Sequence, residues 1–178
     1  MLSTNTQINF QKLNTVHVLD QYGGEVALSS FWKSKPAILV FLRSFDCPAC
    51  RGYCHDVWSK KDQYQANGSR IVFIGNGDHR VIEDFKKELN IQDAPIYTDP
   101  SRESFKVCGY KKVTDPYSEG GMKNIEAYQK RGFKIGTFGP KAGDGVQLGG
   151  IIVIKPGNLI AYHYISEVAG DYPEFIQS

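Results

Sequence analysis

The sequence predicts an α/β fold in which helices flank a mixed central sheet. Residues 37–43 and 151–154 are almost continuously apolar, as expected for strands buried on both faces. Segments with helical spacing follow the first of these strands and alternate with further strands, which is typical of β-α-β units. The last strands follow each other closely and predict an antiparallel return.

An N-terminal β-hairpin precedes the central strand. Residues 16–20 and 26–28 have the composition of short strands, and Gly23-Gly24 supplies a tight turn between them. A brief helical turn over residues 31–33 then leads into the strand over 37–43.

Helices and strands alternate after the central strand. The longest predicted helix begins at Pro48, because the first helical position tolerates proline, and it ends near residue 66 before Asn67-Gly68. The elements that follow are a strand over 70–75, a helix over 80–89 capped by Asp78, a short strand over 96–98 and a short helix over 100–107.

Residues 109–147 lack a clear period, so we expect an insertion or long loop there, with a helix over 122–130. Strands over 151–154 and 159–165 then pair across a turn, and a last helix is expected over 171–177. Because the chain has neither internal repeats nor a linker, residues 1–178 are expected to form a single domain.

Composition excludes several classes of protein. The chain has 178 residues, 41% of them hydrophobic and 22% charged, which suits one domain with a substantial core. A net charge of +2 without basic blocks argues against a nucleic-acid partner. No apolar run reaches the roughly 18 residues of a membrane span. Residues 1–7 do not resemble a signal peptide, so we expect a reducing, cytoplasmic setting.

The most informative motif is Cys47-Pro48-Ala49-Cys50, between a buried strand and the start of a helix. Unpaired backbone N–H groups in a first helical turn stabilise a thiolate over a thiol. Two intervening residues are few enough for the second sulfur to reach the first and close a disulfide. Cys47 and Cys50 are therefore candidate redox residues.

A zinc site is the main structural alternative for this pair. Zinc would require two more ligands at a similar spacing, and the sequence has no second pair of that kind. We therefore expect neither a metal nor another bound cofactor. Cys54 and Cys108 are expected to be small buried apolar residues.

Arg43 and Arg51 flank the cysteines, and each has two possible roles. A guanidinium beside a thiolate lowers its pKa and can hold a peroxide oxygen. A salt bridge at the surface is the alternative, and Arg51 could simply point to solvent.

Other polar and aromatic features have simpler explanations. Gly75-Asn76-Gly77 lies between a strand and a helix, but Arg80 replaces the third glycine of a dinucleotide-binding loop, so we interpret the segment as a turn. His55 is expected to face solvent or a carbonyl, and Tyr53 and Trp58 to be packing residues.

Residues 41–51, Phe-Leu-Arg-Ser-Phe-Asp-Cys-Pro-Ala-Cys-Arg, resemble the Phe-Leu-Arg-x-Phe-x-Cys-x-x-Cys-Arg motif of the AhpC/TSA-type peroxiredoxin-like proteins. Four further segments match the same family in order: residues 74–77, 98–103, 145–150 and 169–171. The resemblance covers about residues 13–172. It implies a thioredoxin-like fold and thiol-based peroxide or disulfide chemistry.

The resemblance leaves the order of the two thiols open. Alignment with peroxiredoxins makes Cys50 the attacking thiol, with Arg43 in place of their proline and Cys47 in place of their threonine. Alignment with thioredoxins makes Cys47 the attacker and Cys50 the resolving thiol. We favour Cys47, because the residue just before a helix is usually the more exposed. Gly149 occupies the position of the thioredoxin cis-proline, where glycine lets a backbone approach closely.

The leading hypothesis is a peroxiredoxin-like enzyme that reduces hydroperoxides through a Cys47–Cys50 dithiol/disulfide cycle. Thioredoxin or glutathione would be the reductant, and a homodimer is possible. The alternative is a thioredoxin-like protein disulfide reductase or redox regulator without peroxidase activity. A third hypothesis is a binding module in which the cysteines are incidental.

Overall fold

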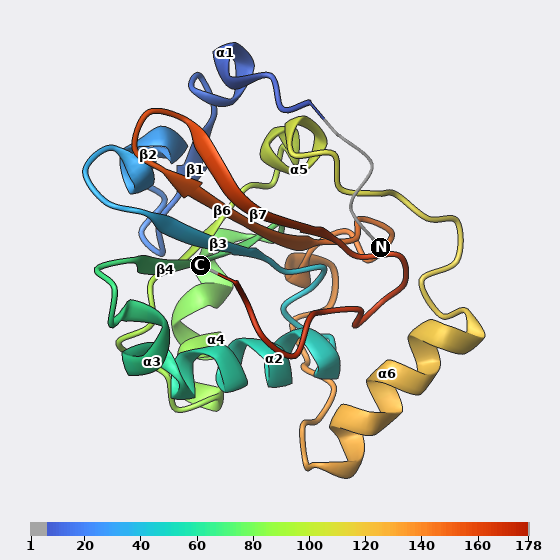
Figure 1. The fold of residues 1–178 in the computed structure, drawn as a ribbon. Helices are drawn as coiled ribbons and strands as arrows, with labels where there is room; N and C mark the ends of the chain where they lie inside the picture. The colour runs from blue at the N-terminus through green and yellow to red at the C-terminus, as the bar shows by residue number, and fades with distance from the viewer. Residues whose placement is uncertain (1–6, 178) are drawn as a thin grey trace.

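The computed structural model describes residues 7–177 (Figure 1). Residues 1–6 lie outside the described residues. The prediction that residues 1–7 are not a signal peptide therefore falls almost entirely on residues that the structure does not describe. Within residues 7–177, no helix has the length and apolar character needed to span a membrane.

Seven strands form one mixed sheet in the order β2-β1-β5-β4-β3-β6-β7. The strands are β1 (His17–Leu19), β2 (Glu25–Ala27), β3 (Ala37–Phe41), β4 (Arg70–Gly75), β5 (Ile96–Thr98), β6 (Gly150–Lys155) and β7 (Leu159–Ile165). Strands β3, β4 and β5 are parallel, whereas β6 pairs antiparallel with both β3 and β7. Strands β1 and β2 form the predicted N-terminal hairpin. The predicted α/β class and mixed sheet are confirmed.

Helices cover both faces of this sheet (Figure 1). They are α1 (Phe10–Leu13), α2 (Pro48–Ser59), α3 (Lys61–Gln65), α4 (Ile82–Glu88), α5 (Glu103–Val107) and α6 (Glu119–Lys130), with short 3₁₀ turns at η1 (Leu28–Trp32), η2 (His79–Val81) and η3 (Gly139–Ala142). Ile38 and Val40 of β3 face the core beneath α2 and α4. Leu39 and Phe41 face the core beneath α1 and α5. Burial on both faces explains why β3 is apolar throughout.

Two predicted helices differ in detail from the structure. The helix expected over 48–66 is divided at Lys60, whose backbone leaves the helical region (φ −103°, ψ 16°). The helix expected over 80–89 begins as the 3₁₀ turn η2, and the Asp78 side chain caps that turn by accepting from the Arg80 N–H, as predicted. The sequence did not indicate α1.

The last predicted helix, over residues 171–177, is wrong, because this segment is irregular and lies across α2 (Figure 1). Pro173 lacks an N–H and disfavours helical geometry in the residue before it. Tertiary hydrogen bonds hold the segment instead. The Tyr53 hydroxyl donates to the Pro173 carbonyl at 2.9 Å, and the Ile176 N–H donates to the Tyr64 hydroxyl at 3.4 Å.

Residues 109–147 form a long connection around one helix. Helix α6 starts at Glu119, three residues before the predicted helix, because the Ser118 side chain caps it by accepting from the Gly121 N–H at 3.4 Å. The end of the connection is tied back to its start by an isolated β-bridge between Lys112 and Gln147. The single domain remains a prediction.

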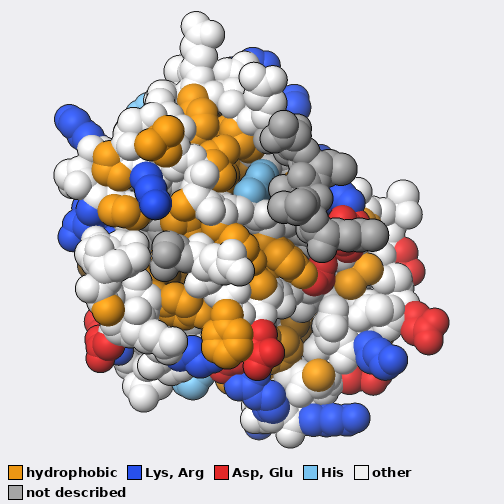
Figure 2. All heavy atoms as spheres, viewed as in Figure 1, with side chains coloured by type: hydrophobic (Ala, Val, Ile, Leu, Met, Phe, Trp, Pro, Cys, Tyr) orange, Lys and Arg blue, Asp and Glu red, His pale blue; other side chains and the backbone are white. Residues whose placement is uncertain are grey.

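Hydrophobic side chains gather on the face of the molecule shown in Figure 2, around β7 and the C-terminal segment. Leu159, Ile160 and Phe175 are among the large hydrophobic residues that remain exposed. Strand β7 is an edge of the sheet. The homodimer named in the sequence analysis stays a prediction.

Candidate active site

The Cys-x-x-Cys motif begins α2 beyond the carboxyl end of β3, as predicted. Cys47 is the N-cap residue, with extended backbone angles (φ −70°, ψ 125°), and Pro48 occupies the first turn. Cys47 is 4% exposed and Cys50 is fully buried, so the expected order of exposure is confirmed. All four cysteines are free thiols.

The surroundings of the two sulfurs shift their pKa values in opposite directions. A hydrogen bond from the Cys50 thiol, together with the charge of Arg43, lowers the pKa of Cys47 to about 5 despite its burial. Burial, followed by the neighbouring Cys47 sulfur, raises the pKa of Cys50 well above that of an ordinary thiol. These shifts favour a thiolate at Cys47 beside a neutral thiol at Cys50.

Arg43 supplies the positive charge at the Cys47 sulfur. Its side chain is almost fully buried, donates to the Gly145 carbonyl at 2.9 Å and lies over the Tyr117 ring at 5.6 Å. Burial lowers the pKa of Arg43, but the adjacent Cys47 and Cys50 sulfurs raise it above its usual value, so the guanidinium stays charged. Its Nε–H is buried without a hydrogen-bond partner.

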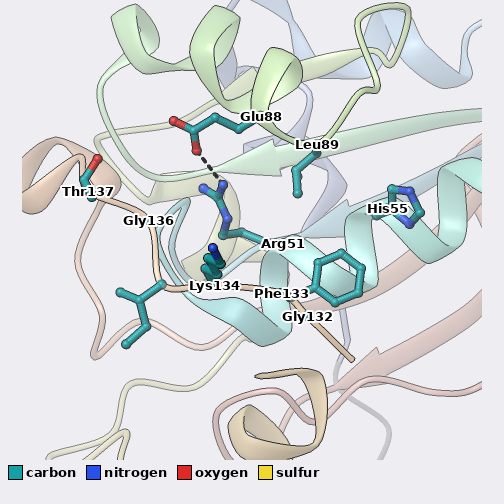
Figure 3. A pocket seen from close by; sticks show the side chains of 10 residues that line it. Arg51, His55, Glu88, Leu89, Gly132, Phe133, Lys134, Gly136 and Thr137 are labelled. Atoms are coloured by element: carbon teal, nitrogen blue, oxygen red, sulfur yellow. Dashed lines mark hydrogen bonds and ion pairs between the residues drawn. The ribbon is translucent and has the colours of Figure 1, made fainter. Parts of the chain in front are cut away.

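Arg51 has the structural role instead. It donates to the Phe45 carbonyl at 3.0 Å and pairs with Glu88 at 2.5 Å. Figure 3 shows its guanidinium directed toward Glu88, in a cavity of about 550 Å³ bounded by α2, α4 and residues 132–137. No sulfur lines that cavity. Arg51 therefore points neither to Cys47 nor to solvent. His55 lines the same cavity, where its side chain is partly exposed and packs against Phe133.

A second cavity, of about 470 Å³, opens over Cys47. Arg43, Ser44 and Cys47 make its polar wall. Met122 and Ile125 of α6 line the same cavity and contribute apolar surface. Residues 109–147 thus supply much of the lining of the cavity over Cys47, and this lining combines polar and apolar side chains.

Asp46 fastens the long connection beside Cys47. Its carboxylate accepts from the Phe138 N–H at 3.0 Å and the Gly139 N–H at 2.9 Å, and its carbonyl accepts from the Gly136 N–H at 2.9 Å. The residue next to Cys47 in sequence therefore positions the loop that walls the cavity.

The Gly75-Asn76-Gly77 turn makes a second attachment. The Asn76 side chain donates to the Arg43 carbonyl at 2.9 Å and accepts from the Asp144 N–H at 2.7 Å. A side chain at position 75 would overlap the Phe45 ring. The turn lacks the third glycine of a nucleotide loop, and its contacts are with the site and its covering loop.

Tyr172 lies behind Cys50 and was not identified from the sequence. Its hydroxyl is 3.7 Å from the Cys50 sulfur and 3.0 Å from the Phe41 carbonyl oxygen. A side chain at Gly149 would overlap that carbonyl, so the close approach expected at Gly149 is present. The matched segment 169–171 directly precedes Tyr172, and it was the only signal that could have indicated this residue.

The remaining cysteines are structural, as predicted. Cys54 and Cys108 are fully buried. Burial raises the pKa of Cys108 to about 12 and raises that of Cys54 as well. Tyr53 and Trp58 are buried in the core beneath α2, as expected of packing residues. Within residues 7–177, no group of three or more His, Cys, Asp or Glu side chains is arranged to hold a metal ion.

Comparisons with known proteins identify the family. Residues 56–168, more than half of the chain, match the family model described as AhpC/TSA antioxidant enzyme. The chain belongs to this family. A prostamide/prostaglandin F synthase of Xenopus tropicalis is 32% identical over 171 residues, covering 93% of this chain and 83% of that protein. Human peroxiredoxin-like 2C is 32% identical over 157 residues, covering 83% of this chain and 68% of that protein.

Solved structures agree with the thioredoxin-like fold. Reduced Prx3 from Vibrio vulnificus, solved in complex with H₂O₂, has a TM-score of 0.64 at 12% identity, covering 99% of this chain and 92% of that chain. The bacterioferritin comigratory protein of Xanthomonas campestris has a TM-score of 0.62 at 8% identity, covering 89% of this chain and 84% of that chain. Family and fold together support a thiol redox role. The family match begins at residue 56, after both Cys47 and Cys50, so it does not assign their roles.

Proposed function

We propose that the protein is a thiol peroxidase in which Cys47 attacks a hydroperoxide and Cys50 resolves the product. One observation carries this proposal: Cys47 and the Arg43 guanidinium line the same cavity, where the Cys50 thiol and the Arg43 charge lower the pKa of Cys47 to about 5. Thiolates rather than thiols attack peroxides, and an adjacent cation stabilises the negative charge that develops on the leaving oxygen.

The first half of the cycle oxidises Cys47. Its sulfur attacks the terminal peroxide oxygen, so that an S–O bond forms and the O–O bond breaks. The other oxygen leaves, takes a proton and departs as an alcohol, or as water when the substrate is hydrogen peroxide. The Arg43 guanidinium lines the same cavity as Cys47, and its positive charge would stabilise the negative charge that develops on the leaving oxygen.

The second half closes a disulfide. The Cys50 sulfur forms an S–S bond with Cys47, the S–O bond breaks, and the hydroxyl leaves with the Cys50 proton as water. Two thiol equivalents from thioredoxin or glutathione then restore the dithiol. Cys50 suits this later role because it is buried and protonated in the resting protein.

The position of Cys47 favours a peroxide over a protein disulfide as the oxidising substrate. The sulfur is only 4% exposed, and α6 lines the cavity above it. A hydroperoxide can enter such a cavity, whereas a folded protein disulfide would require the connection over residues 109–147 to open. The disulfide reductase without peroxidase activity is therefore the weaker candidate.

A second candidate substrate comes from relatives named prostamide/prostaglandin F synthase. The apolar side of the cavity, with Met122 and Ile125, suits a lipid substituent. Two electrons from the same dithiol would cleave an O–O bond in a lipid peroxide by the attack described above. This second candidate function uses the same two cysteines and differs only in the substrate.

Peroxide consumption with a dithiol reductant tests the proposal. The double variant Cys47→Ser, Cys50→Ser is expected to lose turnover, whereas Cys108→Ala, which removes a thiol far from the cavity, should retain it. Assays with hydrogen peroxide, an alkyl hydroperoxide and a lipid peroxide identify the substrate, and insulin reduction measures the competing activity. Undiminished peroxide turnover in the double variant would reject the proposal.

A further inference from the structure

We propose that Tyr172 promotes closure of the Cys47–Cys50 disulfide by donating a hydrogen bond to the Cys50 sulfur as that sulfur loses its proton. This inference rests on the proposed function and adds a residue to its second half. Tyr172 comes from the irregular segment after β7, far in sequence from the Cys-x-x-Cys motif.

The Tyr172 hydroxyl has one proton and two acceptors within reach. The Phe41 carbonyl oxygen lies at 3.0 Å and the Cys50 sulfur at 3.7 Å. A carbonyl oxygen accepts more strongly than a neutral thiol, but an ionised acceptor makes the stronger bond. In the resting protein the hydroxyl therefore donates to Phe41. When Cys50 becomes negative, a rotation of the hydroxyl about its C–O bond brings the same proton to the sulfur.

The hydroxyl is a donor and not a base. Burial, followed by the neighbouring Cys50 sulfur, raises the pKa of Tyr172 well above its usual value. The proton therefore stays on Tyr172 throughout the cycle, and the Cys50 proton leaves with the Cys47 hydroxyl as water.

Packing holds Tyr172 in this position. Its ring stacks on Tyr53 with centroids 4.4 Å apart and planes at 10°. The neighbouring residues are fixed as well, because the Tyr164 hydroxyl donates to the Asp171 carboxylate at 2.5 Å and the Ser166 hydroxyl donates to the Asp171 carbonyl at 2.5 Å. A rigid donor loses little freedom when it stabilises a charge that appears only during reaction.

Cys50 needs such a donor because it is fully buried, and a thiolate in that position is costly. The Arg43 charge acts on both sulfurs and most strongly on Cys47, and it leaves the pKa of Cys50 well above that of an ordinary thiol. Slow closure leaves the Cys47 sulfenic acid open to a second peroxide, which converts it to a sulfinic acid. Tyr172 therefore biases the oxidised enzyme toward the reversible disulfide.

The test compares wild type with Tyr172→Phe, which keeps the ring and its stacking on Tyr53. One equivalent of tert-butyl hydroperoxide is added, and samples are quenched over time with a sulfenic-acid trap for mass spectrometry. Oxidation of Cys47 should stay within about twofold of wild type, which also shows that the variant is folded. Disulfide closure should slow about tenfold, equivalent to about 1.4 kcal/mol. The pH profile of closure should move to higher pH, and excess peroxide should give more sulfinic acid.

Tyr53→Phe is the matched control. It removes the neighbouring hydroxyl, which holds the Pro173 carbonyl and not a sulfur. Closure at the wild-type rate in Tyr172→Phe would overturn the inference, as would equal slowing in Tyr53→Phe, because that result assigns the effect to anchoring of the segment. If wild type forms no Cys47–Cys50 disulfide, the proposed function itself fails. The two failures can be told apart: if only the Tyr172 role is wrong, wild type still forms the Cys47–Cys50 disulfide.

Discussion

At the scale of single residues, the two thiols differ because each faces a different environment. Cys47 is the N-cap residue of α2, lines the cavity and is influenced by the charge of the Arg43 guanidinium. Cys50 lies one turn further along the helix, where it is sealed in the core beside Tyr172. Their positions on the helix therefore give the two sulfurs different neighbours, as the proposed roles of attacking and resolving thiol require.

Removing the Arg43 charge should make Cys47 harder to ionise. We expect Arg43→Met to raise the pKa of Cys47 from about 5 by roughly 1–3 units, the usual effect of losing an adjacent opposite charge. Because a raised pKa leaves less thiolate below it, alkylation of Cys47 near pH 6 should slow in the variant, while wild type stays near its plateau. The measurement is the pH dependence of iodoacetamide labelling at Cys47.

Arg51→Met is the control for that experiment. It removes an equally buried arginine that pairs with Glu88 rather than with the sulfurs, so the Cys47 profile should remain that of wild type. An unchanged profile in Arg43→Met would remove Arg43 from the account.

The sequence predicted the candidate pair but not all of its surroundings. Cys47, Cys50 and Arg43 lie within eight residues of one another, so local spacing indicated the two cysteines and placed Arg43 near them, with both of its roles left open. The roles of Arg51 and Tyr172 depend on partners distant in sequence. Glu88 is 37 residues from Arg51, and Phe41 is 131 residues from Tyr172. No local pattern specifies such contacts.

At the scale of elements, α6 forms part of the site because it packs closely on α2. Gly52 of α2 lies directly beneath Tyr128 of α6 and Phe133 of the following loop. The absence of a side chain at position 52 lets α6 approach, and α6 then lines the Cys47 cavity.

Two helical glycines should therefore respond oppositely to substitution by alanine. Gly52→Ala should destabilise the protein by about 1–3 kcal/mol, because the new methyl group would overlap the Tyr128 ring. Gly120→Ala should be stabilising by up to about 1 kcal/mol, because helix propensity favours alanine and the nearest atom, on Val168, is 3.7 Å away. Urea unfolding measures both free energies, and a neutral Gly52→Ala would contradict the close packing.

Element boundaries were less predictable than element types. The α/β order followed from periodicity. The helix over 48–66 is divided at Lys60, where no neighbouring proline or glycine allows the break to be predicted. The helix expected over 171–177 did not form, because tertiary contacts with Tyr53 and Tyr64 hold that segment in an irregular conformation across α2. Over residues 109–147, α6 was predictable from its sequence, whereas the loop's attachment to Asp46 was not.

At the scale of the whole molecule, one sheet separates two cores and carries the site at its edge. The core beneath α2 includes Trp58, and the core on the opposite face includes Trp32. Strand β3 contributes to both, so we expect the two cores to unfold together as a single domain.

The two tryptophans allow this to be measured, because the chain contains no others. Trp32→Phe leaves only Trp58 as a fluorescent reporter, and Trp58→Phe leaves only Trp32. In each variant the fluorescence transition in urea should coincide with the far-UV circular dichroism transition, as in two-state unfolding. A fluorescence midpoint that separates from the dichroism midpoint in either variant would contradict a single cooperative domain.

The central claim is that Cys47 is the sulfur that attacks peroxide, and the most direct test is mass spectrometry after one equivalent of hydroperoxide. Cys50→Ser should accumulate a sulfenic acid on Cys47, because the attacking thiolate remains and its resolving partner is gone. Cys47→Ser should show no oxidation at position 50 on the same timescale. A sulfenic acid on Cys50 in Cys47→Ser, with Cys47 left reduced in Cys50→Ser, would contradict the account.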